Sequence, residues 1–384
     1  MDKRVYLLVA IAFGVGMVEL IIGGILDLVA SDLNITVGQA GLLITFFALT
    51  FAISGPILLY VTRNIDRKLV TLFALVIFFM ANLIVIFSDT YLMVLLSRIL
   101  SAASGALLVV LCLTLAAHIS SVENRGRAIG LVVMGISGSV VLGLPIGVSL
   151  GHAFGWRSPF ILVTILTVLL ILGVFLFFGK VIQKETLTLK DQIGTLKNRR
   201  VFFGHLTTFF FLAGHFTLYG YLTPYVQEAF GFAGTLITTV YFIYGLAAVT
   251  GGGLAGYSAD RFGVRQTLLI SIVLLGVSLF LIPFSAGVFF WMILVIWGIL
   301  SWAITPPVQT HLIEIARETA DIQQSLNNAA LHFGIAFGTF VGSFVIDHFT
   351  VFVNPFVGII FVALSFISAK ISLTEPVQPV TEKM

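Results

Sequence analysis

Charged residues and cysteine are scarce in this sequence. Only 10% of its 384 residues are Asp, Glu, Lys or Arg, whereas 59% are hydrophobic, and the mean hydropathy is +1.12. This composition is outside the range of ordinary soluble domains and indicates a protein that crosses the lipid bilayer several times. The single cysteine, Cys112, excludes an internal disulfide and a cysteine-based metal site. We expect neither a metal nor a cofactor.

The distribution of the few charges also limits the possible partners. The net charge is +3, but the basic residues are spread through short connections, so we expect no nucleic-acid partner. A membrane-embedded enzyme would need a cluster of acidic, histidine or metal-binding residues at the membrane surface. We find no such cluster, and we therefore predict that the protein is not an enzyme and has no catalytic residues.

Twelve apolar runs are long enough to cross the hydrocarbon core of a bilayer, which takes about 20 residues. The sequence therefore predicts an all-α membrane protein with 12 transmembrane helices. We interpret the first run as a retained helix, because it is longer than the apolar part of a signal peptide and lacks a small-residue cleavage site. The runs cover residues 5–30, 37–62, 69–88, 91–119, 126–151, 157–179, 201–229, 234–257, 265–285, 288–316, 323–347 and 351–372.

Basic residues mark one side of the predicted membrane protein. Of the 20 Lys and Arg residues, 18 fall at the termini or in even-numbered connections. Arg157 lies at the opposite face, and Arg98 lies inside a span. Because positive charge is retained on the cytoplasmic side, we predict a multi-pass protein of the cell membrane with both termini in the cytoplasm.

The longest polar connection divides the spans into two sets of six. We predict an N-terminal six-helix bundle at 1–179, a cytoplasmic linker at 180–200 and a C-terminal six-helix bundle at 201–384. Arg67 after the second span and Arg265 after the eighth occupy matching positions, which indicates a parallel repeat. Duplicated bundles of this kind are typical of secondary transporters.

A turn motif follows the eighth span, with the pattern G-x-x-x-D-R-x-G-x-R. Gly256 and Gly263 would permit a tight turn between helices, and Asp260 could cap a helix end. An ordinary charged turn is the alternative interpretation. The equivalent loop at 59–68 keeps only the basic end of the pattern, with Arg63 at the position of the acid. The motif residues are Gly256, Asp260, Arg261, Gly263 and Arg265.

This pattern resembles the cytoplasmic loop signature of the major facilitator superfamily. The fifth span contains Gly143, Pro145 and Gly147, which resemble the glycine and proline motif of proton antiporters in that family. A glycine-rich packing helix kinked at Pro145 is a second interpretation, and both can hold together. Arg98 and its neighbours at 97–105 resemble the arginine motif of the family's fourth helix.

The resemblance extends over nearly the whole chain to purine efflux permeases, which are hypoxanthine and adenine exporters of the drug:proton antiporter group in that superfamily. It is carried by VELIIGGIL, SGPILL, LAGHFTLYGY and the stretches 295–316 and 321–338. Asp27 departs from the family, which usually has a proline there. The resemblance implies the major facilitator fold, export of purine bases, nucleosides or their analogues in exchange for protons, and a monomer.

Two ionisable residues lie well inside predicted spans of the N-terminal half. A carboxylate at the bilayer centre costs about 2.5 to 3.5 kcal/mol on insertion scales, so such residues are functional hypotheses. The resemblance implies that the first and fourth helices line one central cavity, where Glu19 and Arg98 could approach each other. We predict that Glu19 couples transport to protons and that Arg98 is its modulator or a partner that competes with the substrate. A purely structural ion pair is the alternative.

The C-terminal spans are rich in aromatic and neutral hydrogen-bonding side chains. A flat heterocycle needs aromatic faces for stacking, and amide or imidazole groups for its ring nitrogens. Packing between helices and anchoring at the membrane interface are the alternatives, and we expect the interface for His205. The predicted substrate-binding residues are His215, Tyr219, Trp297, Trp302, Gln309, Gln324, Asn327, Asn328 and His332.

Two further possibilities stay open at this stage. The same fold could serve a broader multidrug or sugar exporter, because aromatic cavities also bind lipophilic cations and glycosides. Uptake instead of efflux is also compatible with the sequence, since alternating access is reversible. In each case the expected partners are a small-molecule substrate, protons and the lipid bilayer.

Overall fold

The computed structural model describes residues 2–180 and 194–374, and their regular structure is helical. Twelve helical segments in these ranges are long and apolar enough to cross a membrane, which confirms the twelve predicted spans to within a few residues at most ends. The helices are α1 Arg4–Gly24, α2 Leu26–Asp32, α3 Val37–Val61, α4 Arg67–Phe87, α5 Tyr91–Ile119, α6 Arg125–Gly138, α7 Leu144–Phe154, α8 Ser158–Phe177, α10 Arg199–Tyr219, α11 Leu222–Phe230, α12 Thr235–Phe262, α13 Val264–Leu281, α14 Gly287–Ala303, α15 Thr305–Ile315, α16 Ala320–His348 and α17 Asn354–Ser372.

Several predicted spans consist of two helices. The first span breaks at Ile25 between α1 and α2, and the seventh breaks at Tyr221 between α10 and α11. The fifth contains a π-helical segment, Ser139–Gly143, just before Pro145. The remaining short elements are 3-10 turns at Val122–Asn124, Thr195–Lys197, Ile282–Phe284, Arg317–Thr319 and Val351–Val353.

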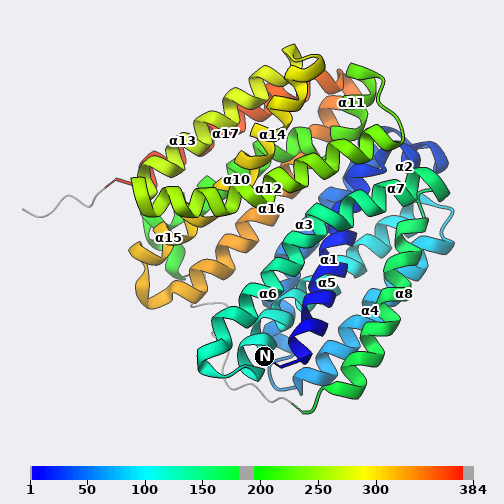
Figure 1. Ribbon diagram of the computed structural model, residues 1–384, viewed down its shortest axis with the longest axis vertical. Helices are drawn as coiled ribbons and strands as arrows, with labels where there is room; N and C mark the ends of the chain where they lie inside the picture. The colour runs from blue at the N-terminus through cyan, green and yellow to red at the C-terminus, as the bar shows by residue number, and fades with distance from the viewer. Residues whose placement is uncertain (1, 181–193, 375–384) are drawn as a thin grey trace, which may run out of the picture.

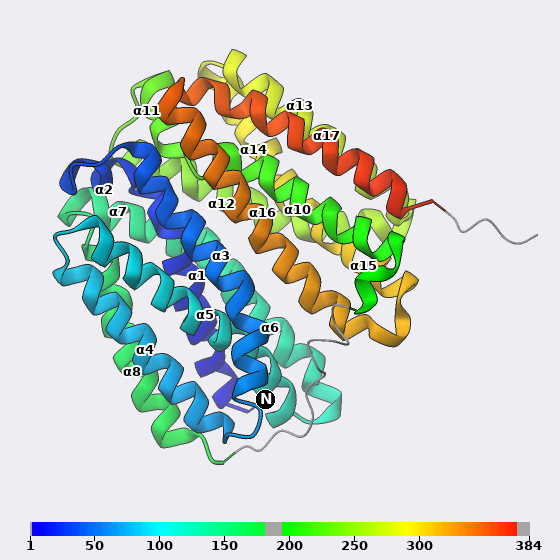
Figure 2. The same cartoon turned by 180° about the vertical axis from the view of Figure 1, so that it is seen from behind.

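The helices form two bundles, as predicted for the fold. Helices α1 to α8 make up one bundle and α10 to α17 the other, and they lie side by side in both views (Figures 1 and 2). The central part of the predicted linker, residues 181–193, lies outside the described residues. The first residues of α1 and the last of α17 lie at the same end of the molecule, which we call the terminal end. The other end carries α2 and α11.

The bundles are joined by hydrogen bonds toward the end that carries α2 and α11. On α16, Asp347 accepts hydrogen bonds from the Thr36 hydroxyl, at 2.9 Å, and from the Gly38 amide, at 3.1 Å. This carboxylate lies at the N-terminus of α3, where unpaired amides and the helix dipole favour negative charge. One turn earlier on α16, the Ser343 hydroxyl donates to the Gly38 carbonyl at 2.8 Å.

The break in the first span creates a second junction between the bundles. Because α1 ends at Gly24, the carbonyl groups of its last turn lack helical partners. The Gly23 carbonyl accepts hydrogen bonds from the hydroxyls of Thr223, at 3.0 Å, and Tyr241, at 2.9 Å. One turn further out, Gln227 donates to Asp27 at 2.6 Å. Among the described residues, the hydrogen bonds between the bundles involve no residue of the first bundle beyond Thr45.

Glycine allows several helix pairs to approach closely. A Cβ atom at Gly16 would meet the Ser139 side chain, and one at Gly147 would meet Ile21. The fifth span therefore packs against α1 through its small residues, as the packing interpretation of its glycine motif predicted. The closest approach of this kind joins α12 to α14, where a Cβ at Gly251 would overlap the Ile299 carbonyl oxygen.

We predict that Gly251→Ala destabilises the protein, because a backbone atom cannot move aside as a flexible side chain can. The cost of such overpacking is about 1–3 kcal/mol. Thermal unfolding of the purified protein in detergent would measure it. The adjacent Gly252→Ala is the matched control, because a Cβ there meets nothing within 4 Å. Equal unfolding temperatures for the two variants would contradict the prediction.

Candidate functional site between the bundles

Glu19 lies near the middle of the interface between the two bundles. It occupies the last third of α1, and its side chain is 19% exposed. Its Oε1 lies 3.2 Å from Nε2 of His332, which belongs to α16 of the other bundle. Glu19 thus contacts a predicted substrate-binding residue rather than the predicted partner on the fourth span.

Arg98 binds the main chain of α1. It is fully buried, and its guanidinium donates to the carbonyls of Val18, at 2.8 Å, and Glu19, at 3.3 Å. Its Cζ lies 4.1 Å from the centre of the Phe47 ring, a cation–π arrangement. The expected pairing of Arg98 with the Glu19 carboxylate is therefore corrected to a main-chain contact. Arg98 holds the turn of α1 that carries Glu19 and places a positive charge beside it.

His332 is held from two sides. Its Nδ1 lies 2.9 Å from the Asn328 carbonyl one turn earlier, and its ring stacks on Phe51 of α3 with a centroid separation of 4.3 Å. These two contacts orient Nε2 toward Glu19. No motif in the sequence distinguished Phe51 from the other phenylalanines of its apolar run.

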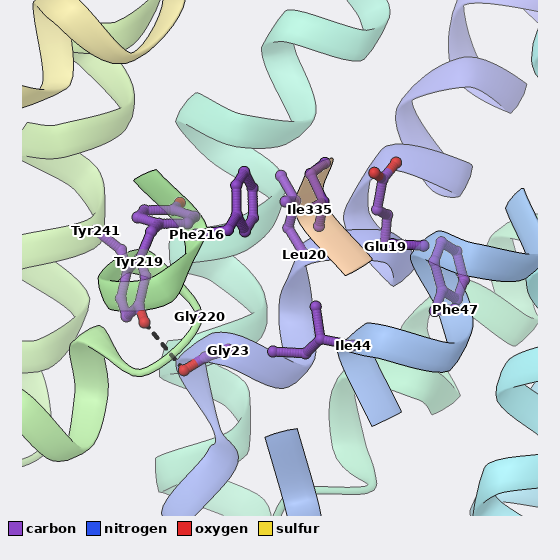
Figure 3. Close-up of a pocket in the computed structure, with 11 residues that line it drawn as sticks. Glu19, Leu20, Gly23, Ile44, Phe47, Phe216, Tyr219, Gly220, Tyr241 and Ile335 are labelled. Carbon is purple, nitrogen blue, oxygen red and sulfur yellow. Dashed lines mark hydrogen bonds between the residues drawn. The ribbon is translucent and has the colours of Figure 1, made fainter. Parts of the chain in front are cut away.

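Two pockets lie on either side of the Glu19 and His332 pair. The first contains Glu19 and has walls from both bundles, including Phe47, Phe216 and Tyr219. Figure 3 shows the Glu19 side chain on the opposite side of this pocket from Tyr219, with Leu20 and Ile335 between them.

The second pocket lies between α3, α5 and α16. It is lined by Phe51 and Asn328, the two residues that hold His332, and by Ser325 one turn closer to the terminal end. Of the predicted amide residues, only Asn328 lines one of these two pockets, and it lines the second.

His215, Tyr219, Tyr244 and Trp297 form one aromatic cluster inside the second bundle. Trp297 is fully buried, and its Nε1 donates to His215 Nδ1 at 3.1 Å. His215 Nε2 therefore carries its hydrogen and donates to the Tyr244 hydroxyl at 3.0 Å. Both ring nitrogens of His215 are occupied, so His215 and Trp297 support the pocket from behind. Tyr219 stacks on His215 at 5.1 Å and reaches the pocket itself.

The other predicted amides differ in position. Asn327 is buried inside its bundle and accepts a hydrogen bond from Thr208 at 2.7 Å. Gln324 is exposed, whereas the adjacent Gln323 is buried and pairs with His205 at 2.9 Å. His205 is thus buried, which corrects its expected place at the membrane interface.

Trp302 and Gln309 lie away from the pair. Trp302 is half-buried at the end of α14, and Gln309 is half-buried on α15. Neither residue lines either of the two pockets. Their assignment to substrate binding remains a prediction that these contacts do not support.

The turn motif after the eighth span is only partly a turn. Gly263 has φ = +88°, a conformation that glycine adopts at little cost, and it separates α12 from α13. Gly256 and Asp260 lie within α12, which corrects the expected turn and cap. Arg261 donates to the Tyr257 hydroxyl at 2.8 Å, and Arg265 is exposed at the start of α13. The gating role of the motif remains a prediction.

Comparison with known proteins identifies the family. The model of the Major Facilitator Superfamily matches residues 8–339, with a second match at 205–383. This chain belongs to the Major Facilitator Superfamily. The uncharacterized MFS-type transporter YbcL of Bacillus subtilis (strain 168) is 33% identical over 368 residues, which is 95% of this chain and 94% of that protein. The inner membrane transport protein YdhP of Escherichia coli (strain K12) is 28% identical, over 88% of this chain and 87% of its own length.

Solved structures share the fold. A bacterial homolog of the human lysosomal transporter Spinster, in an inward-facing and occupied conformation, superposes with a TM-score of 0.78 at 15% identity, over 97% of each chain. The superfamily and the transporter class predicted from the sequence are therefore confirmed. The resemblance to purine exporters remains a prediction.

We predict that Trp297→Phe destabilises the protein with little change in substrate affinity. Phenylalanine keeps an aromatic ring but has no N–H group. His215 Nδ1 would then be buried without a hydrogen-bond donor. An unsatisfied buried group costs about 1–3 kcal/mol. Thermal unfolding and the KM for transport would be measured together. A large change in KM at unchanged stability would show instead that Trp297 contacts the substrate.

Proposed function

We propose that this member of the superfamily exports small planar organic molecules in exchange for protons, with purine bases or nucleosides as the first candidates. The observation that carries the proposal is the Glu19 carboxylate, which lies in a pocket between the bundles and contacts His332 of the opposite bundle. A proton that binds or leaves there changes a contact between the two halves that must move apart. Such a carboxylate can couple proton movement to alternating access.

The proposed orientation supports export from the cytoplasm. With both termini in the cytoplasm, the junctions made by Asp347 and by Gly23 close the outer half. The one basic residue assigned to the outer face, Arg157, is bound there by Asp32 at 2.7 Å and Asp89 at 3.3 Å. The second pocket lies on the cytoplasmic side of His332, so a cytoplasmic substrate would reach Glu19 from that side.

The pocket walls favour a flat substrate. Phe47, Phe216 and Tyr219 provide ring faces, while Asn328 and Ser325 provide hydrogen-bonding groups in the adjoining pocket. Purines match this combination because each has a stacking face and polar edges. A multidrug exporter is the second candidate, because most of the first pocket is apolar. Sugar export has less support, since the first pocket offers few polar groups.

The proposal predicts purine flux driven by a pH gradient in proteoliposomes. Radiolabelled hypoxanthine and adenine would be followed with and without the gradient, and Glu19→Gln would abolish the gradient dependence because an amide carries no titratable proton. Glu314→Gln is the matched control, since Glu314 is an exposed carboxylate on α15. Accumulation against a gradient by the Glu19 variant would refute the coupling role. Proton-driven flux of lipophilic cations without purine flux would favour the multidrug candidate.

A further inference from the structure

The hydrogen-bonding state of His332 is determined by its own helix. Its Nδ1 lies 2.9 Å from the Asn328 carbonyl, and a carbonyl oxygen can only accept a hydrogen bond. Nδ1 must therefore carry a hydrogen. In the neutral imidazole, Nε2 then has a lone pair and no hydrogen. His348, on the same helix, makes the same contact with the Phe344 carbonyl at 2.9 Å and stacks on Phe344 at 4.2 Å.

What distinguishes His332 from His348 is the carboxylate that faces it. Nε2 lies 3.2 Å from Glu19 Oε1, so a lone pair on nitrogen would face a lone pair on oxygen if both groups were unprotonated. That arrangement is repulsive, whereas a proton on the imidazole turns the contact into an ion pair. The contact is attractive only when one proton is bound, and that proton lies between the two bundles.

We propose that Glu19 and His332 share this one proton, and that the substrate takes its place by donating an N–H group to the same two atoms. This inference rests on the proposed function and names the chemical class of its substrate. When the proton leaves to water on the cytoplasmic side, Glu19 Oε1 and His332 Nε2 become two adjacent acceptors. A substrate N–H group that points between these two atoms shares its hydrogen with both of them, and no other bond is made or broken.

The surrounding charges favour a neutral substrate. Arg98 on α5 is the charged group beside the pair, and α3 presents the rings of Phe47 and Phe51 to Arg98 and His332. The tyrosines that line the first pocket are Tyr219 and Tyr241, and the Tyr241 hydroxyl is already bound to Gly23 (Figure 3). With Arg98 positive and Glu19 negative, the site has no net charge after the proton leaves. A neutral N–H heterocycle preserves that balance, whereas a cationic substrate would add charge beside Arg98.

The inference predicts that substrate binding releases protons and requires N–H groups. The purified full-length protein in weakly buffered detergent solution would be titrated with hypoxanthine while a pH dye records the protons released. We expect about one proton to be released per hypoxanthine bound. The probe 1,9-dimethylhypoxanthine keeps the ring but lacks N–H, and we expect it to bind at least about tenfold more weakly, a difference of about 1.4 kcal/mol.

Variants separate the shared proton from a proton held by Glu19 alone. In His332→Gln the side-chain amide can donate to the Glu19 carboxylate, so the pair needs no bound proton. Binding of hypoxanthine should then release far less than one proton per molecule. His348→Gln removes the similar histidine that lacks the carboxylate, and it should release as many protons as the unmodified protein. Retained proton release in His332→Gln, with hypoxanthine still bound, would overturn the shared proton.

Other outcomes distinguish this inference from the proposed function. Equal binding of hypoxanthine and its dimethyl form would overturn the N–H requirement while leaving proton-coupled purine export intact. Proton release on binding of tetraphenylphosphonium, which has no N–H and carries a positive charge, would overturn the neutral substrate class and still support a proton antiporter. If neither flux nor proton release occurs with any of these compounds in the unmodified protein, the proposed function itself fails.

Discussion

The contact between Glu19 and His332 brings a half-buried carboxylate to the boundary between the two helix bundles. A charge inside the bilayer is tolerated where a partner compensates it, and here the partners come from three helices. Arg98 binds the main chain at Glu19, His332 faces the carboxylate, and Phe51 holds the imidazole in place. On its other side, α1 packs closely against the glycines of the fifth span. In the proposed mechanism, one proton at this contact affects how the two bundles meet.

The closed half of the molecule depends on backbone groups that the helices leave free. Where α1 stops, its Gly23 carbonyl binds hydroxyls of the second bundle, and where α3 starts, its first amides bind Asp347. Helix ends are the places where a membrane helix still has hydrogen bonds to offer. These junctions are polar and lie beside close packing between the bundles, where Tyr221 of the second bundle fills the space at Gly41 of the first.

Many polar residues of the second bundle support its own structure. His215 is bound on both ring nitrogens, Asn327 pairs with Thr208, and Gln323 pairs with His205. A bundle with internal hydrogen bonds can move as one body while the first bundle rocks against it. The side chains left for the pockets are then few, chiefly aromatic rings and the residues around His332. This division explains why a list of polar residues overestimates the binding site.

The sequence by itself determined the class of protein, the twelve spans and the intramembrane carboxylate, because length, hydropathy and a charged residue within an apolar run can be recognised without knowledge of neighbours. The tertiary structure decided which side chain meets which. Asn327 and Asn328 are adjacent, yet one is buried within its bundle and the other lines a pocket, and Gln323 rather than Gln324 turns inward. In a soluble helix, alternation of apolar and polar residues marks the buried face. In a membrane helix lipid and protein neighbours are both apolar, so that signal is weak, and only packing revealed His332 as the partner of Glu19.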